Sequence, residues 1–320
     1  MSRKKRFGKK GGFTIVELLT VMSVIIILIG LLVPALNKVK QYAKEVKQRA
    51  QFHSIDVAME LFETENDGYP DSGEEGPDGV AYCGAMKLAE AMVGQDLLGF
   101  HRDSVFRADL RDASGTDTLY TTPSGPTPPA TSGQSRMGPY LQLENANATR
   151  LVPYDPGAPL NEEPGIYDSL SNFTTPAFMD ELFVLCDVYT RQMPNTGYKV
   201  GMPILYYKAN RSGTCNPTIG NSHDRDDEDN IYDYKDNDDL VDEGVPWSTI
   251  SNQEHPMDAD VAEGADDNGE GVEETFYWSI WNSKISLADG RPYRLDSYIL
   301  LSAGWDGLYG TRDDIYNFQK

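Results

Sequence analysis

The chain has 320 residues, enough for one good-sized globular domain beyond an N-terminal segment. It carries 50 Asp and Glu against 28 Lys and Arg, a formal net charge of −22. Such a surface repels nucleic acid and anionic membranes and attracts cations, so the composition excludes nucleic-acid binding as the main function. Three cysteines exclude a fully paired intramolecular set. A single bridge between Cys186 and Cys215, or buried thiols including Cys83, both fit this number.

The first 33 residues combine a basic tail with a long apolar run. The run covers residues 13–33, which are enough to span a bilayer at about 1.5 Å per residue. It is also too long for the core of an ordinary secretory signal. A plain membrane anchor explains the run and the basic tail, but not Glu17, because a carboxylate inside an apolar span is costly to desolvate.

The glycine–phenylalanine junction, the acid and a later proline resemble the leader and stem of type IV pilins and pseudopilins. The resemblance implies that prepilin peptidase cuts between Gly12 and Phe13 and methylates the new amino terminus. Glu17 is then the fifth mature residue, and Pro34 stands where the family often has a helix-kinking proline. In that family the acid is thought to meet the amino terminus of a neighbouring subunit. A buried amine and carboxylate offset each other's desolvation, so Glu17 is expected to set the register of assembly.

The apolar run is expected to continue as a helix to Asn66, forming a rod of roughly 80 Å. Apolar residues recur at near-helical spacing at Val39, Tyr42, Ala43, Val46, Ala50, Ile55, Ala58, Met59 and Phe62. Pro34 is expected to bend or locally melt the helix, because proline lacks a backbone donor. Gly68 is expected to form a left-handed cap, and Pro70 then stops the helix.

Basic residues also follow the apolar run, at Lys38, Lys40, Lys44, Lys47 and Arg49. They could pair with acids of adjacent subunits, or they could simply be solvated. Because they lie beyond the apolar run, charge bias gives only a weak indication of topology. The family resemblance, and not the charge count, places the amino terminus in the cytoplasm.

Beyond the stem, the pattern predicts an α+β fold with an antiparallel sheet packed against the exposed half of the long helix. A helix is expected at 81–98, with Met86, Ala89, Met92, Val93 and Leu97 at core spacing. Residues 114–138, rich in Ser, Thr, Gly and Pro, are expected to form a mobile excursion. Residues 182–189 fit a helix or a strand, and a strand is favoured because 202–208 follows and the two could form a hairpin. Further strands are expected at 275–281 and 297–302.

Two acidic stretches are candidates for calcium-binding loops, but neither matches the EF-hand pattern. Residues 224–244 carry 11 acids, but an EF-hand loop counted from Asp236 places Val241 at the required glycine. Residues 258–274 fail as well, because counting from Asp266 places Tyr277 where a glutamate is required. The expected structure of 224–244 is a solvated loop, and weak metal binding by either stretch stays open.

The carboxyl-terminal loop is a stronger calcium candidate. Three carboxylates, Asp306, Asp313 and Asp314, flank a turn that contains three glycines. Calcium takes six to eight oxygen ligands in flexible geometry, and carboxylates with backbone carbonyls could supply them. The loop resembles the calcium-binding Gly-x-Asp-Gly…Asp-Asp-Ile ending of the major pseudopilin of type II secretion. The resemblance implies that these three aspartates hold a structural calcium that pins the loop to the sheet.

The resemblance covers residues 8–70 and 297–318, and implies a definite organisation of the chain. The expected parts are a cleaved leader (1–12), a transmembrane segment (13–33), the periplasmic stem (34–66), a globular α+β region with a large insertion (67–296), and the carboxyl-terminal strand and calcium loop (297–320). The protein would cross the inner membrane once, with its amino terminus cytoplasmic and its globular domain periplasmic.

The expected function is that of a structural subunit of a type II secretion pseudopilus. Its partners would be identical and related pilin-like subunits, prepilin peptidase, the secretion assembly platform and the membrane. The alternatives are a type IV pilin for adhesion or motility, and a minor or tip subunit whose insertion binds sugar or a secreted substrate. An enzyme is not expected, because no nucleophile elbow, metal-ligand cluster or histidine constellation accompanies the acids.

Overall fold

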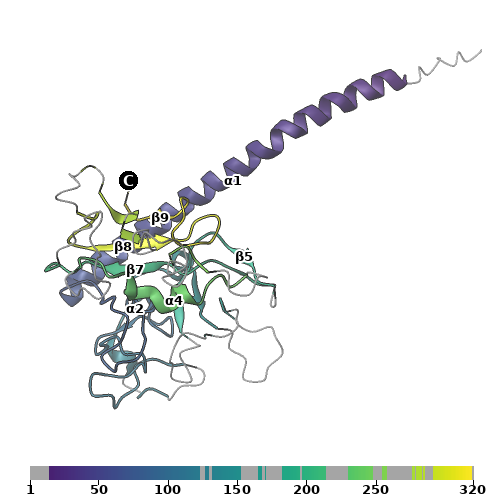
Figure 1. Ribbon diagram of the computed structural model, residues 1–320. Coiled ribbons are helices and arrows are strands. Elements are labelled where there is room, and N and C mark those ends of the chain that lie inside the picture. The colour runs from purple at the N-terminus through teal and green to yellow at the C-terminus, as the bar shows by residue number, and fades with distance from the viewer. Residues whose placement is uncertain are drawn as a thin grey trace, which may run out of the picture. The chain divides into compact units, whose positions relative to one another are not determined.

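The computed structural model describes residues 14–122, 127–129, 132–152, 165–167, 170, 182–194, 197–213, 230–247, 254–257, 276–277, 279–282, 284 and 291–318. The chain divides into two compact units, Met1–Lys44 and Glu45–Lys320. The long helix α1 (Ile15–Asn66) contributes to both units and is the purple ribbon in Figure 1.

Helix α1 is continuous over 52 residues and passes through Pro34 without interruption. The expectation of local melting at this proline is therefore wrong. The helix ends at Asn66, as the sequence predicted, but the left-handed residue that follows is Asp67 (φ 57°) and not Gly68. Aspartate tolerates this conformation because its short polar side chain can bond locally.

The second half of α1 packs against a three-stranded antiparallel sheet and a short helix, α2 (Gly84–Val93). The sheet has the order β7 (Leu205–Lys208), β8 (Tyr298–Ser302) and β9 (Ile315–Tyr316). The buried face of α1 consists of Gln48, Gln51, Phe52, Ile55, Ala58, Met59 and Phe62. It shares one apolar cluster with Tyr206, Tyr298, Leu300 and Ile315 of the sheet. The α+β class is thus confirmed, including the sheet on the helix.

Polar contacts fix the angle between α1 and the sheet. Asp56 of α1 accepts hydrogen bonds from the Tyr298 hydroxyl at 2.6 Å and from Asn317 Nδ2 at 3.2 Å. Arg294 Nη1 lies 3.3 Å from the same carboxylate. One carboxylate therefore joins α1 to both ends of the β8–β9 hairpin.

The remaining elements are short. The described pairs are β1 (Phe100–His101) with β2 (Arg136–Met137), β3 (Ala148–Arg150) with β4 (Phe183–Leu185), and β5 (Arg191–Gln192) with β6 (Lys199–Val200), all antiparallel. The short helical elements are η1 (Ser132–Ser135), α3 (Leu143–Ala146), η3 (Tyr234–Asn237) and α4 (Asp238–Asp242).

Three predicted elements differ from the structure. The hairpin of 182–189 with 202–208 is wrong, because β4 pairs with β3 and β7 pairs with β8. The two segments are nevertheless antiparallel neighbours at a bridge between Cys186 and Pro203. There the Asp187 N–H donates to the Met202 carbonyl at 2.8 Å and the Ile204 N–H to the Leu185 carbonyl at 2.7 Å. The strand at 275–281 is also wrong, since 276–277 and 279–280 are helical. The helix predicted at 81–98 is real but shorter, and Leu97 already has a positive φ of 61°.

The acidic segment 224–244 is not a solvated loop over its described part. From residue 230 it forms η3 and α4, and Tyr232, Asn237 and Leu240 are buried. Asn237 links this segment to the core, because its Oδ1 accepts the Ala85 N–H at 2.8 Å. The buried aromatic and aliphatic side chains supply enough apolar contact to hold an acidic sequence inside the fold.

The described part of 114–138 is likewise packed and not an excursion. Leu119 and Tyr120 are buried, and Arg136 pairs with Asp96 at 2.7 Å. The Arg136 guanidinium also lies 4.4 Å from the centre of the Tyr120 ring.

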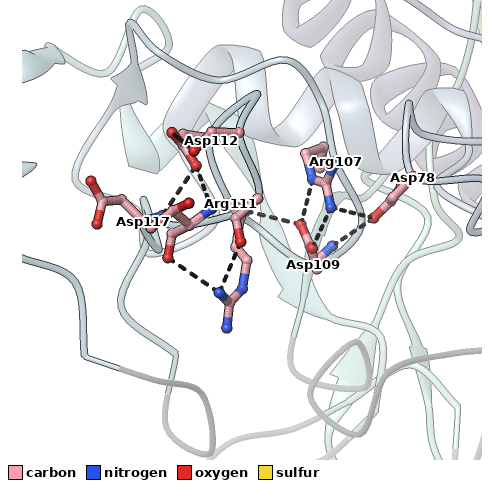
Figure 2. Close-up of polar contacts among 9 residues, drawn as sticks. Asp78, Arg107, Asp109, Arg111, Asp112 and Asp117 are labelled. Atoms are coloured by element: carbon pink, nitrogen blue, oxygen red, sulfur yellow. Dashed lines mark hydrogen bonds and ion pairs between the residues drawn. The ribbon is translucent and has the colours of Figure 1, made fainter.

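The preceding loop is held by an ion pair and by side-chain hydrogen bonds to its own backbone, as Figure 2 shows. Arg107 forms a bidentate pair with Asp109, with N···O distances of 2.9 and 2.7 Å. Asp112 Oδ1 accepts the backbone N–H groups of Thr116 and Asp117, and Arg111 Nη1 donates to the Gly115 carbonyl. These contacts turn a Ser/Thr/Gly/Asp-rich sequence into an ordered loop.

Two of the three cysteines lie in the core. Cys83 and Cys186 are free, buried thiols, and burial raises the pKa of each to about 12. Cys215 lies outside the described residues, as do Gly12 and Phe13 at the expected cleavage site.

Candidate functional site

The first part of α1 presents an apolar surface that nothing within its own unit covers. In the Met1–Lys44 unit every residue from 14 to 43 is exposed, for example Ile15 at 78 % and Leu31 at 70 %. Among the described residues, α1 is the helix that is long and apolar enough to cross a membrane. Exposed aliphatic side chains on this scale need a lipid or protein environment.

Glu17 lies in the first turn of α1 and bonds back to Thr14. Its Oε2 accepts the Thr14 N–H at 2.9 Å and the Thr14 hydroxyl at 2.8 Å, and the Glu17 N–H donates to Thr14 Oγ1 at 3.3 Å. A threonine followed three residues later by a glutamate is the capping-box pattern. The sequence interpretation missed this local role, although the Thr-x-x-Glu spacing could have revealed it.

The part of α1 in the Glu45–Lys320 unit has a second apolar face opposite its buried one. Val46, Ala50, Val57 and Leu61 are exposed, and at 3.6 residues per turn they fall on one stripe. The stripe lies on the side of the helix away from Ile55. The apolar positions predicted from the sequence therefore belong to two different faces of the helix. Helical spacing alone does not say which of these residues are buried.

The carboxyl-terminal loop joins β8 to β9 and is tied together by its own aspartates. Asp313 Oδ2 accepts the Asp306 N–H at 2.8 Å, and Asp313 Oδ1 accepts the Thr311 hydroxyl at 2.7 Å. Asp314 Oδ2 accepts the Gly310 N–H at 2.9 Å. Gly304 has a φ of 66°, and a Cβ there would meet the Asp313 carbonyl at 2.1 Å, so this turn requires glycine.

The structure brings two of the three predicted calcium ligands together. Burial, and then the neighbouring Asp313 carboxylate, raise the pKa of Asp306. Burial opposes ionisation of Asp313, but hydrogen bonds from Thr311 and from the Asp306 N–H outweigh it, and its pKa is lowered. The donor set of two adjacent carboxylates and a hydroxyl suits a hard cation. Among the described residues, however, no group of three or more His, Cys, Asp or Glu side chains is arranged to hold a metal.

A polar cleft of about 540 Å³ lies at the carboxyl end of α1, and the sequence interpretation did not anticipate it. Asp71, Lys208 and Asp296 line it, together with the buried Asp236. Burial raises the pKa of Asp236 to about 8, while a hydrogen bond from the Ser72 hydroxyl opposes that shift. Burial opposes ionisation of Asp71, but Lys87 Nζ lies 2.7 Å from its Oδ2 and the pKa of Asp71 is lowered.

The strongest functional candidate is thus the doubly apolar helix α1 with Glu17 in its first turn. No family model, curated protein or solved structure matches this chain.

Proposed function

We propose that this protein is a structural subunit of a helical filament, a pseudopilus of a type II secretion system. Prepilin peptidase would cut between Gly12 and Phe13, and the protein would be anchored in the inner membrane until it assembles. Its globular unit would lie in the periplasm, and the assembly platform and related subunits would be its partners. The function is assembly and not catalysis.

The observation that carries this proposal is the exposed apolar stripe on α1. A bilayer needs only about 20 residues of apolar helix, and residues 13–33 supply them. Val57 and Leu61 lie more than 20 residues farther along, which is over 35 Å at about 1.5 Å per residue. A membrane anchor has no use for apolar side chains there, whereas a neighbouring stem in a filament would cover them.

The asymmetry of the molecule favours an open polymer. Each subunit would offer one face of α1 to one neighbour and a different face to the next, which generates a helical filament when the rotation does not close. Glu17 would neutralise the amine of Phe13 in a neighbouring subunit, so that only a correctly staggered neighbour satisfies both charges. A type IV pilin for adhesion or motility would use the same stem contacts. The aspartates of the carboxyl-terminal loop favour the secretion class.

The capping box makes a sharp test of Glu17 possible. Glutamine also serves at the third position of a capping box, so Glu17→Gln keeps the cap and removes the charge. We expect Glu17→Gln and Glu17→Val both to reduce filament assembly at least tenfold in cells that carry the assembly machinery, measured by electron microscopy of sheared filaments. Asp103→Asn, at an exposed carboxylate outside α1, is the control and should assemble normally. Normal assembly of Glu17→Gln would show that capping is enough and that the charge sets no register.

We also propose that Asp306 and Asp313 hold a structural calcium ion, with Asp314 supporting the loop. Isothermal titration of the full chain in detergent micelles should show calcium binding in the micromolar to millimolar range. A protein with calcium at 100 times its dissociation constant gains about 2.7 kcal/mol of stability, which a chelator should remove. Asp306→Asn with Asp313→Asn should abolish both effects, whereas Asp103→Asn on the exposed surface should leave them unchanged. The absence of a calcium isotherm for the unaltered chain would disprove this assignment.

A further inference from the structure

A pocket of about 240 Å³ opens beside α1 in the Glu45–Lys320 unit. We call it the stem pocket, and it is lined by Lys47, Ala50, Gln51, Ser54, Glu144, Asn145, Asn147, Val188 and Thr190. Since a water molecule takes about 30 Å³ of liquid volume, the pocket has room for a long side chain. Ala50 belongs both to this pocket and to the exposed apolar stripe, so the two surfaces are continuous.

Gln51 lines this pocket, and its amide is held by the fold. The side chain is only 6 % exposed, and its Nε2 donates to the Cys186 carbonyl at 2.9 Å and to the Ala146 carbonyl at 3.4 Å. Its Oε1 is buried and has no hydrogen-bond partner within the described part of the chain. The polar groups open to a guest are therefore those of the exposed charged side chains that line the pocket.

The mouth of the stem pocket carries one charge of each sign. Lys47 and Glu144 line it, and neither forms an ion pair with any residue that the structure describes. The opposite flank of α1 also carries one charge of each sign. There Arg49 Nη2 lies 2.9 Å from Glu45 Oε1, and both side chains are more than 40 % exposed.

Helix geometry separates these two charged sets. At 3.6 residues per turn, the side chains of Lys47 and Arg49 project roughly 160° apart around the helix axis. Val46 and Ala50 of the stripe lie within this angle. One subunit thus presents a pocket with Lys47 and Glu144 on one flank of the stripe and a Glu45–Arg49 pair on the other. Two copies placed side by side would bring these complementary flanks together.

We propose that the stem pocket receives the Arg49 side chain of a second copy of this chain. The neighbour's guanidinium would donate to the Glu144 carboxylate, and the neighbour's Glu45 would pair with Lys47. Arginine suits this role because its five N–H donors lie in a planar fork that matches the geometry of a carboxylate. The contact joins two different faces of the same chain, as an open helical polymer requires. This inference rests on the proposed filament function.

Charge exchange tests the contact in cells that carry the assembly machinery. Arg49→Glu alone and Glu144→Arg alone should each reduce filament number at least tenfold, because each places like charges together. The double variant Arg49→Glu with Glu144→Arg should recover at least half of the normal number. Arg102→Glu, at an exposed arginine outside α1, is the matched control for a change of net charge and should assemble normally. Thermal unfolding of the monomers in detergent should be nearly unchanged in all four, since exposed ion pairs contribute little.

Cross-linking adds a readout that does not depend on filament number. A chain with Arg49→Cys and Asn145→Cys, joined with a short thiol-reactive linker, should give a ladder of multimers, whereas Asn145→Cys alone should not. Filaments that form normally in both single charge variants and give no ladder would overturn this contact and leave the filament proposal standing. A chain that forms no filaments at all, with every residue intact, would overturn both.

Discussion

Truncation of Met59 to alanine is expected to lower the free energy of unfolding of the Glu45–Lys320 unit by about 2–5 kcal/mol. Met59 is fully buried where α1 meets α2 and the β7–β8–β9 sheet. Alanine would remove the thioether and leave a cavity that the surrounding helix and strands can fill only in part. Urea denaturation of the full chain in detergent micelles, followed by near-ultraviolet circular dichroism, measures the loss.

Val57→Ala is the matched control, because Val57 lies two residues earlier on the opposite face of the same helix and is 45 % exposed. We expect its effect on monomer stability to stay within about 0.5 kcal/mol. Val57→Ala should instead reduce filament assembly, since Val57 lies on the stripe that a neighbouring stem would cover. Equal loss of stability in both variants would show that the two faces of α1 are not distinguished as the structure describes.

Replacing Asp236 with asparagine is expected to stabilise the protein at pH 7 by on the order of 4 kcal/mol. Burial raises the pKa of this carboxyl group to about 8, far above the ordinary value of 3.8. The folded protein therefore keeps a proton that the unfolded chain has released by pH 7. Asparagine has nearly the same shape as the protonated acid and can still accept from Ser72, but it carries no such penalty.

The sign of the pH dependence follows from the raised pKa. The contribution of Asp236 to stability is fully present below pH about 4 and is lost as the pH rises to about 8. Asp71, Asp233 and Lys87 are the charged groups that act on it, the two acids raising its pKa and the lysine lowering it. His255 acts in the other direction, because burial lowers its pKa to about 4 and the protein loses stability as the pH falls below about 6.5.

The window between pH 6.5 and 8 thus isolates Asp236 from His255. Stability of the unaltered chain should decline across this window, and the decline should be clearly smaller in the Asp236→Asn variant. Asp103→Asn, at an exposed carboxylate, should retain the decline. Parallel profiles for the unaltered chain and Asp236→Asn would mean that Asp236 is ionised in the folded state.

Local patterns in the sequence predicted the features that depend on neighbouring residues. The helical period and the stop after Asn66 located α1, the apolar run at 297–302 located β8, and the glycines of the carboxyl-terminal loop indicated its tight turns. Each of these depends on contacts within a few residues, or on the backbone conformation of one residue. The capping box of Thr14 and Glu17 is also local, but the sequence interpretation assigned Glu17 only to pairing with a neighbouring subunit.

Strand pairing and burial were decided by contacts between distant parts of the chain. Residues 183–185 form a strand as predicted, but their partner is β3, because alternation in one segment carries no information about which other segment it meets. The sequence predicted that the acids around Asp236 are solvated. In the structure, Asn237 and the aromatic residues beside them are held by α2 and the sheet. Lys87 and Glu90 are buried in α2 for the same reason, since their partners, Asp71 and Tyr82, come from outside the helix.

The sequence by itself determined that this protein has a long apolar helix with an acid in its first turns, because helix formation and membrane-length hydrophobicity are properties of consecutive residues. The tertiary structure decided which face of that helix is already occupied. Packing against α2 and the sheet takes up the face of Ile55 and Met59 and leaves the stripe of Val46, Val57 and Leu61 exposed. The exposed stripe and the adjoining stem pocket exist only because distant segments fold onto one side of α1, and they are the surfaces on which the proposed filament depends.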